Sequence, residues 1–212
     1  MHIPDGFISA PVAVATGVIA AVAIAYGVKA TSGKMGDKQV PMMGVLAAFI
    51  FAAQMLNFPV AGGTSGHFVG AALAAILLGP WSAVLILSSV LLVQCLVFQD
   101  GGLLALGANI FNMGVIGAFS SYLLYKGIYT VSKKNKAGRL IGGFAGAWFS
   151  VVIAALCCAA ELAISGTSPW EMAIPTMGSV HALIGIGEGF ITVAVLGLIM
   201  ATRSDLFELQ IA

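Results

Sequence analysis

Charged residues are scarce in this sequence. Only 8% of its 212 residues are Asp, Glu, Lys or Arg, whereas 60% are hydrophobic and the mean hydropathy is +1.06. A soluble domain has roughly a quarter of its residues charged. The composition therefore excludes a soluble globular protein and predicts a single transmembrane domain over residues 1–212.

Basic stretches with interleaved aromatics, a secretory signal and paired cysteines are lacking as well. The net charge is +1, so nothing points to a nucleic-acid partner. Cys95, Cys157 and Cys158 lie inside apolar runs, which suits small buried side chains better than disulfides or a thiolate metal site. The opening residues MHIPDG have no basic region or cleavage pattern, so we expect Met1 to remain residue 1.

Apolar runs of membrane-spanning length are abundant. A transmembrane helix needs about 20 apolar residues, and the sequence offers segments at 8–29, 41–57, 67–79, 81–98, 106–128, 139–164 and 179–202. The third segment is short, because the glycine-rich stretch PVAGGTSG precedes it and Gly79-Pro80 follows it. Merging the third and fourth segments would leave Pro80 inside a helix, where proline breaks or kinks the backbone.

The positions of Lys and Arg favour seven crossings. All nine follow the first segment, lie between the fifth and sixth, or follow the seventh: Lys29, Lys34, Lys38, Lys126, Lys133, Lys134, Lys136, Arg139 and Arg203. With seven crossings and the N-terminus outside, all three places are cytoplasmic, as the positive-inside rule requires. We therefore predict an all-α integral membrane protein with seven transmembrane helices and a cytoplasmic C-terminus.

This topology places the histidines on one side. His2, His67 and His181 fall at extracytoplasmic ends of segments or in outer loops, and histidine is the commonest metal ligand. Carboxylates map to the same side: Asp5, Asp100, Glu161 and Glu171. The sequence therefore predicts an extracytoplasmic entrance that attracts cations.

Met1-His2 has the spacing of a tridentate chelate. The amine of residue 1, the amide nitrogen of residue 2 and Nδ1 of a residue-2 imidazole close a five-membered and a six-membered ring around one ion. The ion must displace the amide proton, which favours Ni(II) or Cu(II) in a nitrogen-rich tetragonal field. The alternative is a polar residue on a frayed terminus, but the following IPDGFI predicts a turn that folds the terminus back onto the protein.

His67 is the best candidate for a fourth nitrogen. It opens the short third segment after a glycine-rich stretch, and such interrupted segments mark transporter binding sites. Thr64 or Ser65 is expected to cap this helix. The alternative for His67 is a structural hydrogen bond to its own helix or to a loop carbonyl.

Five other polar residues are candidates for supporting roles around the ligands: Asp5, Ser65, Asn109, His181 and Glu188. His181 and Glu188 are seven apart and so share a helix face. A carboxylate within a membrane span is a functional candidate, either orienting a ligand or pairing with His181. Asn109 and Asn112 are amides that can bond across helices or steady a ligand loop.

The first segment carries small residues at intervals of four: Ala13, Gly17, Ala21 and Ala25. Such a stripe lets another helix approach closely, either within this chain or from another subunit. The only Gly-Lys pair, Gly33-Lys34, does not belong to a phosphate-binding loop of the pattern G-x-x-x-x-G-K-[ST]. Val28 stands where this motif has its first glycine, and Met35 stands where it has Ser or Thr. Energy for any driven transport would therefore have to come from another chain.

Four stretches together resemble a known family: MHIPDGFIS at the start, FPVAGGTSGHFVGAALAAILLGP at 58–80, FQDGGLLALGANIFNM at 98–113 and HALIGIGEGFIT at 181–192. They are similar to the CbiM/NikM family, the substrate-capture subunits of energy-coupling-factor transporters for cobalt and nickel. The resemblance covers residues 1 to about 200.

The resemblance implies an inserted N-terminus and a metal held by nitrogens of the first two residues and the TSGH histidine, which are Met1, His2 and His67 here. It implies Ni²⁺ or Co²⁺ as transported substrate, no organic cofactor and no enzymatic activity, in the plasma membrane of a prokaryote. The implied partners, besides membrane lipid, are a transmembrane coupling protein, cytoplasmic ATPases and a small auxiliary membrane subunit. Since this chain stops at residue 212, we expect that subunit to be a separate polypeptide.

Two other functions stay open from the residues alone. A self-sufficient secondary metal carrier would use Glu188 and His181 as a proton relay within the membrane. A membrane metalloenzyme is less favoured, because no general base accompanies the histidines.

Overall fold

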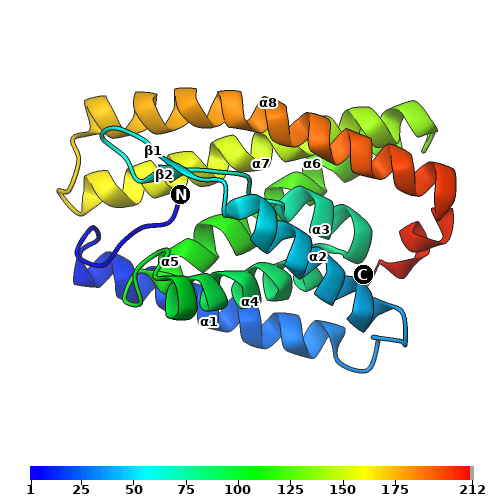
Figure 1. Ribbon diagram of the computed structural model, residues 1–212, viewed down its shortest axis with the longest axis horizontal. Coiled ribbons are helices and arrows are strands. Elements are labelled where there is room, and N and C mark those ends of the chain that lie inside the picture. The colour runs from blue at the N-terminus through cyan, green and yellow to red at the C-terminus, as the bar shows by residue number, and fades with distance from the viewer. Residues whose placement is uncertain (211–212) are drawn as a thin grey trace.

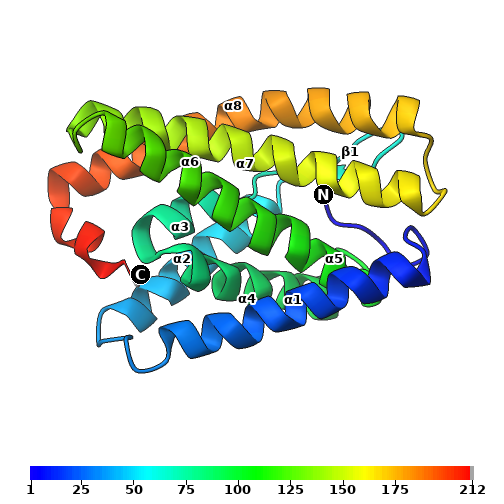
Figure 2. The same cartoon turned by 180° about the vertical axis from the view of Figure 1, so that it is seen from behind.

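The computed structural model describes residues 1–210, and nearly all of its regular secondary structure is helical (Figures 1 and 2). Its elements in chain order are α1 (Ala10–Thr31), α2 (Gln39–Gln54), β1 (Phe58–Pro59), β2 (Ser65–Gly66), α3 (Ala71–Leu78), α4 (Pro80–Phe98), α5 (Leu106–Asn109), the π-helix η1 (Ile110–Ile116), α6 (Gly117–Val131), α7 (Lys136–Ile164), α8 (Trp170–Thr202) and the 3₁₀ helix η2 (Ser204–Leu209). The prediction of an all-α protein is confirmed; β1 and β2 form only a two-residue antiparallel ladder.

Four helices, α1, α4, α7 and α8, are long and apolar enough to cross a membrane. The apolar helix α2 is shorter, with 16 residues, and α5, η1 and α6 follow one another without interruption. Each predicted segment overlaps helical structure in the described chain. The number of crossings and the sides of the two termini stay predictions.

The short helix α3 forms the centre of the molecule. All eight of its residues are buried, and it is packed by α4, α6 and α7. Pro80 separates α3 from α4 as predicted, and it begins α4 one residue before the predicted segment, since proline is tolerated in the first helical turn. Gly79, with φ of 88°, makes the turn between the two helices.

Close helix contacts are made through glycine. A Cβ on Gly146 of α7 would lie 2.8 Å from the carbonyl oxygen of Ser121 in α6, and a Cβ on Gly107 would lie 2.4 Å from Cα of Gly17. Gly17 of the small-residue stripe therefore packs within this chain, whereas Ala21 and Ala25 are exposed. No hydrophobic effect drives helices together within a lipid bilayer. Small residues let the helix backbones pack closely, and this packing stabilises the association.

The start of the third segment differs from the prediction. The helix begins at Ala71, not at His67, because the backbone turns through Gly70 with φ of 80°. Thr64 and Ser65 therefore do not cap it. Ser65 instead belongs to β2, which pairs with β1.

The last helix is longer than predicted. It begins at Trp170, preceded by Pro169, and continues through Pro175 to Thr202. The predicted segment begins at residue 179, nine residues later than the helix does. His181 consequently lies well inside α8 and not at its outer end.

The two ends of the molecule differ in charge. The α1–α2 loop, the α6–α7 turn and the C-terminal segment lie together at one end, and the N-terminal segment and the β1–β2 hairpin lie toward the other (Figures 1 and 2). The basic residues belong to the first end, with eight of the nine in or next to these connections. This end is called the basic end below.

Candidate metal site

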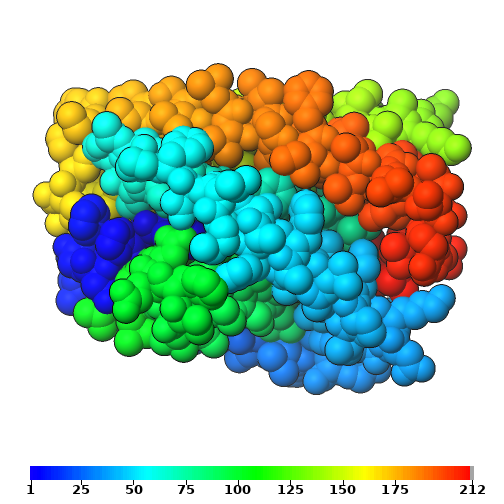
Figure 3. Space-filling view, in the orientation of Figure 1, coloured from blue at the N-terminus to red at the C-terminus, as the bar shows by residue number. Residues whose placement is uncertain are grey.

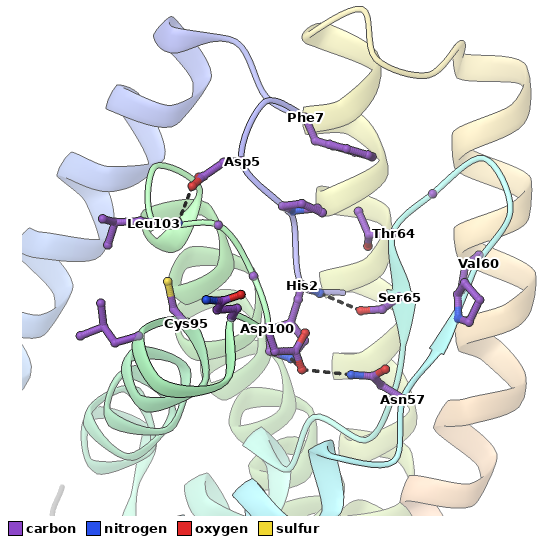
Figure 4. A pocket seen from close by; sticks show the side chains of 17 residues that line it. His2, Asp5, Phe7, Asn57, Val60, Thr64, Ser65, Cys95, Asp100 and Leu103 are labelled. Atoms are coloured by element: carbon purple, nitrogen blue, oxygen red, sulfur yellow. Dashed lines mark hydrogen bonds and ion pairs between the residues drawn. The ribbon is translucent and has the colours of Figure 1, made fainter.

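The N-terminal segment enters the interior of the protein. Met1 and Ile3 have no exposed surface and His2 is 3% exposed. The Met1 amine donates hydrogen bonds to the backbone oxygen and to Oγ of Ser65, the latter at 2.9 Å, and the His2 N–H donates to the same Oγ at 3.1 Å. Figures 3 and 4 place this segment between the hairpin and the α4–α5 loop. The prediction that the terminus folds into the protein is confirmed.

Backbone contacts fix the segment at the level of single residues. The Ile3 N–H donates to Oδ1 of Asn109 at 2.8 Å, and its carbonyl accepts bonds from Nδ2 of Asn109 at 3.2 Å and from the Gly102 N–H at 2.8 Å. Asn109 thus holds the terminal segment in place. A shift of one residue would break all three bonds.

Asp5 has a structural role at this position. Its carboxylate accepts the backbone N–H groups of Leu103 at 3.1 Å and Leu104 at 2.7 Å (Figure 4). It therefore ties the terminal segment to the α4–α5 loop.

The rings of His2 and His67 lie side by side, with centroids 4.5 Å apart and an interplanar angle of 27°. Two imidazoles bound to one ion through nitrogens at about 2.0 Å, at neighbouring corners of a square, would have centroids about 4–4.5 Å apart. Nδ1 of His67 lies 2.7 Å from the Phe68 carbonyl oxygen, which can only accept, so the proton resides on Nδ1. The lone pair of His67 is therefore on Nε2.

Three ring nitrogens at this place are buried without a hydrogen-bond partner among the described residues: Nδ1 and Nε2 of His2 and Nε2 of His67. Buried polar atoms are normally paired, so this cluster points to a ligand that supplies the missing interactions. Burial also lowers the pKa of the Met1 amine to about 5 and that of His2 to about 3. Both groups are then neutral near pH 7, with lone pairs available to a cation.

Side chains alone do not form a metal site. Within residues 1–210, no group of three or more His, Cys, Asp and Glu side chains is placed to hold an ion. The three cysteines are free, and Cys95 and Cys158 are buried as predicted. A site at His2 and His67 therefore requires the backbone nitrogens of residues 1 and 2.

Glu188 holds the loop that carries His67. Its carboxylate accepts the N–H groups of Val69 at 2.6 Å and Gly70 at 2.9 Å, and it is 1% exposed. These bonds replace the helical bonds that residues 67–70 lack, which explains why α3 starts late. Glu188 thus holds the backbone of this loop and does not contact the His67 ring through a hydrogen bond.

His181 lies behind the cluster and is not bonded to Glu188. Its Nδ1 donates to the Met177 carbonyl at 2.8 Å, and its ring also contacts the backbone of Ser65. The alternative of a His181–Glu188 pair is therefore wrong. Asn112 bonds across helices, with Nδ2 donating to Oε2 of Glu161 at 2.7 Å.

Asp100 is a residue of this site that sequence analysis did not single out as a candidate. Its Oδ2 lies 3.7 Å from Nε2 of His2 and accepts Nδ2 of Asn57 at 3.0 Å (Figure 4). Burial raises its pKa, opposed by the nearby Met1 amine and the Asn57 bond. The signal that points to it is its place, directly after a helix and before Gly101-Gly102, which leaves room for His2.

A cavity of about 900 Å³ opens beside the cluster. His2, Asp100 and Asp5 line it, together with residues of the hairpin and of the α4–α5 loop (Figure 4). The two carboxylates give its walls negative character. The cavity offers a cation a route from the surface to His2.

Asp100→Asn is expected to weaken metal binding about 10-fold, because its carboxylate lies 3.7 Å from Nε2 of His2 and is close enough to accept that N–H once the ion holds Nδ1, which would orient the ring and raise its basicity. Nickel titration of the purified chain by calorimetry measures this. Asp37→Asn removes the same charge from an exposed loop at the basic end and should leave affinity unchanged. Equal affinities for the two variants would contradict the role of Asp100.

Comparison with known proteins points to one family. The profile of a family described as "CbiM: Cobalt uptake substrate-specific transmembrane region" matches residues 2–206. A protein of Archaeoglobus fulgidus, provisionally named as a fused nickel transport protein NikMN, is 40% identical over all of this chain and 70% of its own length. A protein of Haloquadratum walsbyi, provisionally named as a metal transport protein, is 41% identical over 99% of this chain and 94% of its own length.

A solved structure has the same fold. The crystal structure of a truncated transition metal transporter superposes with a TM-score of 0.88 at 34% identity, covering 95% of this chain and 99% of the other. These proteins are transporters and not enzymes, and their membrane location agrees with the apolar helices described above. The chain therefore belongs to the CbiM family, as a multi-pass membrane protein of nickel and cobalt transport.

Proposed function

We propose that this chain is the ion-capture subunit of an ATP-driven importer of nickel or cobalt, and that it binds the ion in a square of four nitrogens. These are the Met1 amine, the His2 amide nitrogen, Nδ1 of His2 and Nε2 of His67. The observation that carries the proposal is the convergence of a buried, neutral terminal amine with buried, unpartnered ring nitrogens.

Ser65 marks the positions that the ion would take. Its Oγ accepts hydrogen bonds from both backbone nitrogens of the proposed chelate, at 2.9 Å from Met1 and 3.1 Å from His2. Binding would replace these bonds and release the His2 amide proton. Loss of an amide proton and a planar nitrogen field both favour Ni(II). Cobalt uptake in the family description keeps Co(II) as the second substrate.

The proposed orientation places this site outside and the basic end in the cytoplasm, with seven crossings. The clustering of basic residues at the end away from the site supports it. Ions would enter through the cavity beside Asp100 and leave on the cytoplasmic side. A transmembrane coupling protein, cytoplasmic ATPases and a small auxiliary membrane subunit would drive that step.

A self-sufficient carrier with a Glu188–His181 proton relay is not favoured. The Glu188 carboxylate accepts two backbone N–H groups, and Nδ1 of His181 donates to the Met177 carbonyl. No hydrogen bond connects these two side chains. A relay requires such a connection.

The experiment that tests the site compares two buried histidines. His67→Ala should weaken nickel binding at least about 100-fold, because one of four strong ligands is lost. His181→Ala, in which an equally buried ring is removed from behind the site, should weaken binding about ten-fold at most, since His181 contacts the Ser65 backbone and is not one of the four proposed ligands. Calorimetric titration of both variants, with melting temperatures as the control for folding, decides the matter. Strong loss in His181→Ala with binding retained in His67→Ala would overturn the proposed ligand set.

A further inference from the structure

Arg139, at the basic end, packs its guanidinium against two aromatic rings. Its guanidinium lies 3.8 Å from the ring centroid of Phe207 and 4.8 Å from that of Tyr129. Among residues 1–210, its side chain donates one hydrogen bond, from Nη2 to the Tyr129 hydroxyl at 2.7 Å. A guanidinium has five N–H donors, so most of them are available to a ligand while two rings fix its plane.

A cavity of about 320 Å³ lies beside this guanidinium, between α6 and the C-terminal segment. Three cationic residues line it, Lys126, Lys134 and Arg139, and no Asp or Glu does. None of the three forms an ion pair with a carboxylate in the described part of the chain. Glu208 lines the adjoining hollow, not this one.

The remaining wall is aromatic and polar. It includes Tyr122, Tyr125 and Tyr129, and the Lys126 ammonium lies 5.7 Å from the Tyr122 ring centroid. Tyrosines of this kind are typical of the membrane–water interface, where their rings contact acyl chains and their hydroxyls contact headgroups. Leu123, one turn from Lys126, is 65% exposed, and Val131 at the end of α6 is 85% exposed.

We propose that this cavity binds the phosphodiester headgroup of an anionic phospholipid, with its acyl chains along the exposed face of α6. A planar guanidinium matches two phosphate oxygens, and the two lysines supply further positive charge. A positive cavity without acidic residues favours an anionic lipid over a zwitterionic one. The adjoining apolar surface favours a lipid over a soluble phosphate, since only a lipid would use it. The inference concerns the end of the molecule away from the metal site and does not depend on it (Figure 2).

Basic residues near a membrane surface attract anionic lipid without any site, so the test must separate a cavity from diffuse charge. Lys133 and Lys134 allow this separation. They are adjacent, equally charged and both have left-handed φ, 53° and 56°, but only Lys134 lines the cavity. Lys133→Gln is therefore the matched control for Lys134→Gln.

The experiment measures the melting temperature of the purified full chain in detergent against increasing phosphatidylglycerol, and takes the apparent Kd from the shift. Phosphatidylcholine and inorganic phosphate serve as comparison ligands. Phosphatidylglycerol should stabilise the protein and the other two should not. Arg139→Gln should weaken the apparent Kd about ten-fold or more, Lys134→Gln about five-fold, and Lys133→Gln should leave it unchanged.

Several outcomes would overturn the proposal. Equal weakening by Lys133→Gln and Lys134→Gln would indicate diffuse attraction instead of a cavity. Stabilisation by phosphatidylcholine equal to that by phosphatidylglycerol would indicate a role for acyl chains alone, and stabilisation by inorganic phosphate would indicate a soluble ligand. If Arg139→Gln fails to fold, the comparison of the two lysines decides alone, since both are exposed.

Discussion

Adding two residues before Met1 is expected to abolish tight nickel binding. The proposed site uses the amine of residue 1 itself, and the extension converts this amine into an amide while moving the new amine about 7 Å away. Two residues are added because a single one would make the histidine the third residue of the chain, which is itself a four-nitrogen chelate for Ni(II). Met1 has no exposed surface and its nitrogen contacts Ser65, so the interior offers no room for the extra residues. We expect the affinity to fall at least about 1000-fold, since two donors of the chelate are lost or displaced.

Two measurements check this result. Calorimetric titration gives the affinity, and the absorption and magnetic signature of square-planar Ni(II) should vanish with it. Acetylation of Met1 should have the same effect, because it removes the amine without adding a residue.

The matched control is a two-residue insertion after Gly36, in an exposed loop at the basic end. It changes the chain length equally and should leave the affinity intact. Undiminished binding by the extended protein would eliminate Met1 as a ligand. The melting temperature separates loss of the ligand from loss of folding, because the remaining contacts of Ile3 and Asn109 would also be strained.

Sequence alone identified the parts of this site that lie within a few residues of one another. The chelate spacing of Met1-His2 is a local property, and the turn signal in IPDGFI predicted its burial. His67 was found because glycine interrupts an apolar run just before it. Hydropathy located the helical ranges, since an apolar run of about 20 residues in a membrane must satisfy its own backbone hydrogen bonds and does so as a helix.

The contacts that were missed depend on tertiary structure. Asp100 reaches His2 only because Gly101 and Gly102 let the α4–α5 loop lie against the terminal segment, where Cβ atoms would meet His2 and Asp5. The late start of α3 follows from a carboxylate 119 positions away in sequence from Val69. No local pattern contains such information.

Boundaries at glycine and proline were the other source of error. Pro80 ended one helix and began another, whereas Pro175 lies inside α8. The difference is in the neighbours. Gly79 before Pro80 adopts a left-handed turn, while Pro175 lies near the start of a helix that can accommodate the loss of one backbone bond.

Glu188→Gln is expected to lower both stability and metal affinity. The carboxylate accepts two buried N–H groups with two oxygens, at 2.6 and 2.9 Å. Glutamine has one carbonyl oxygen, so its NH₂ group would face one of these N–H donors. A buried donor without an acceptor destabilises a fold by about 1–3 kcal/mol. The loop of residues 67–70 would loosen, and His67 would have to be reordered when the ion binds.

We therefore expect Glu188→Gln to lower the melting temperature by several degrees and to weaken nickel binding roughly ten-fold, as for other residues that orient a ligand. Thr192→Val is the matched control. Thr192 is one turn further along α8, is 1% exposed, and its hydroxyl has no partner within residues 1–210, so its loss should change neither quantity.

The same variant separates the positioning role from a proton relay. A residue that only carries protons could be replaced by glutamine with affinity and melting temperature intact, and only transport would fail. A residue that holds the His67 loop must instead alter binding by the isolated chain, before any partner or pH gradient is present. Wild-type affinity and melting temperature in Glu188→Gln would contradict the positioning role, whereas a joint decrease would assign Glu188 to the architecture of the metal site.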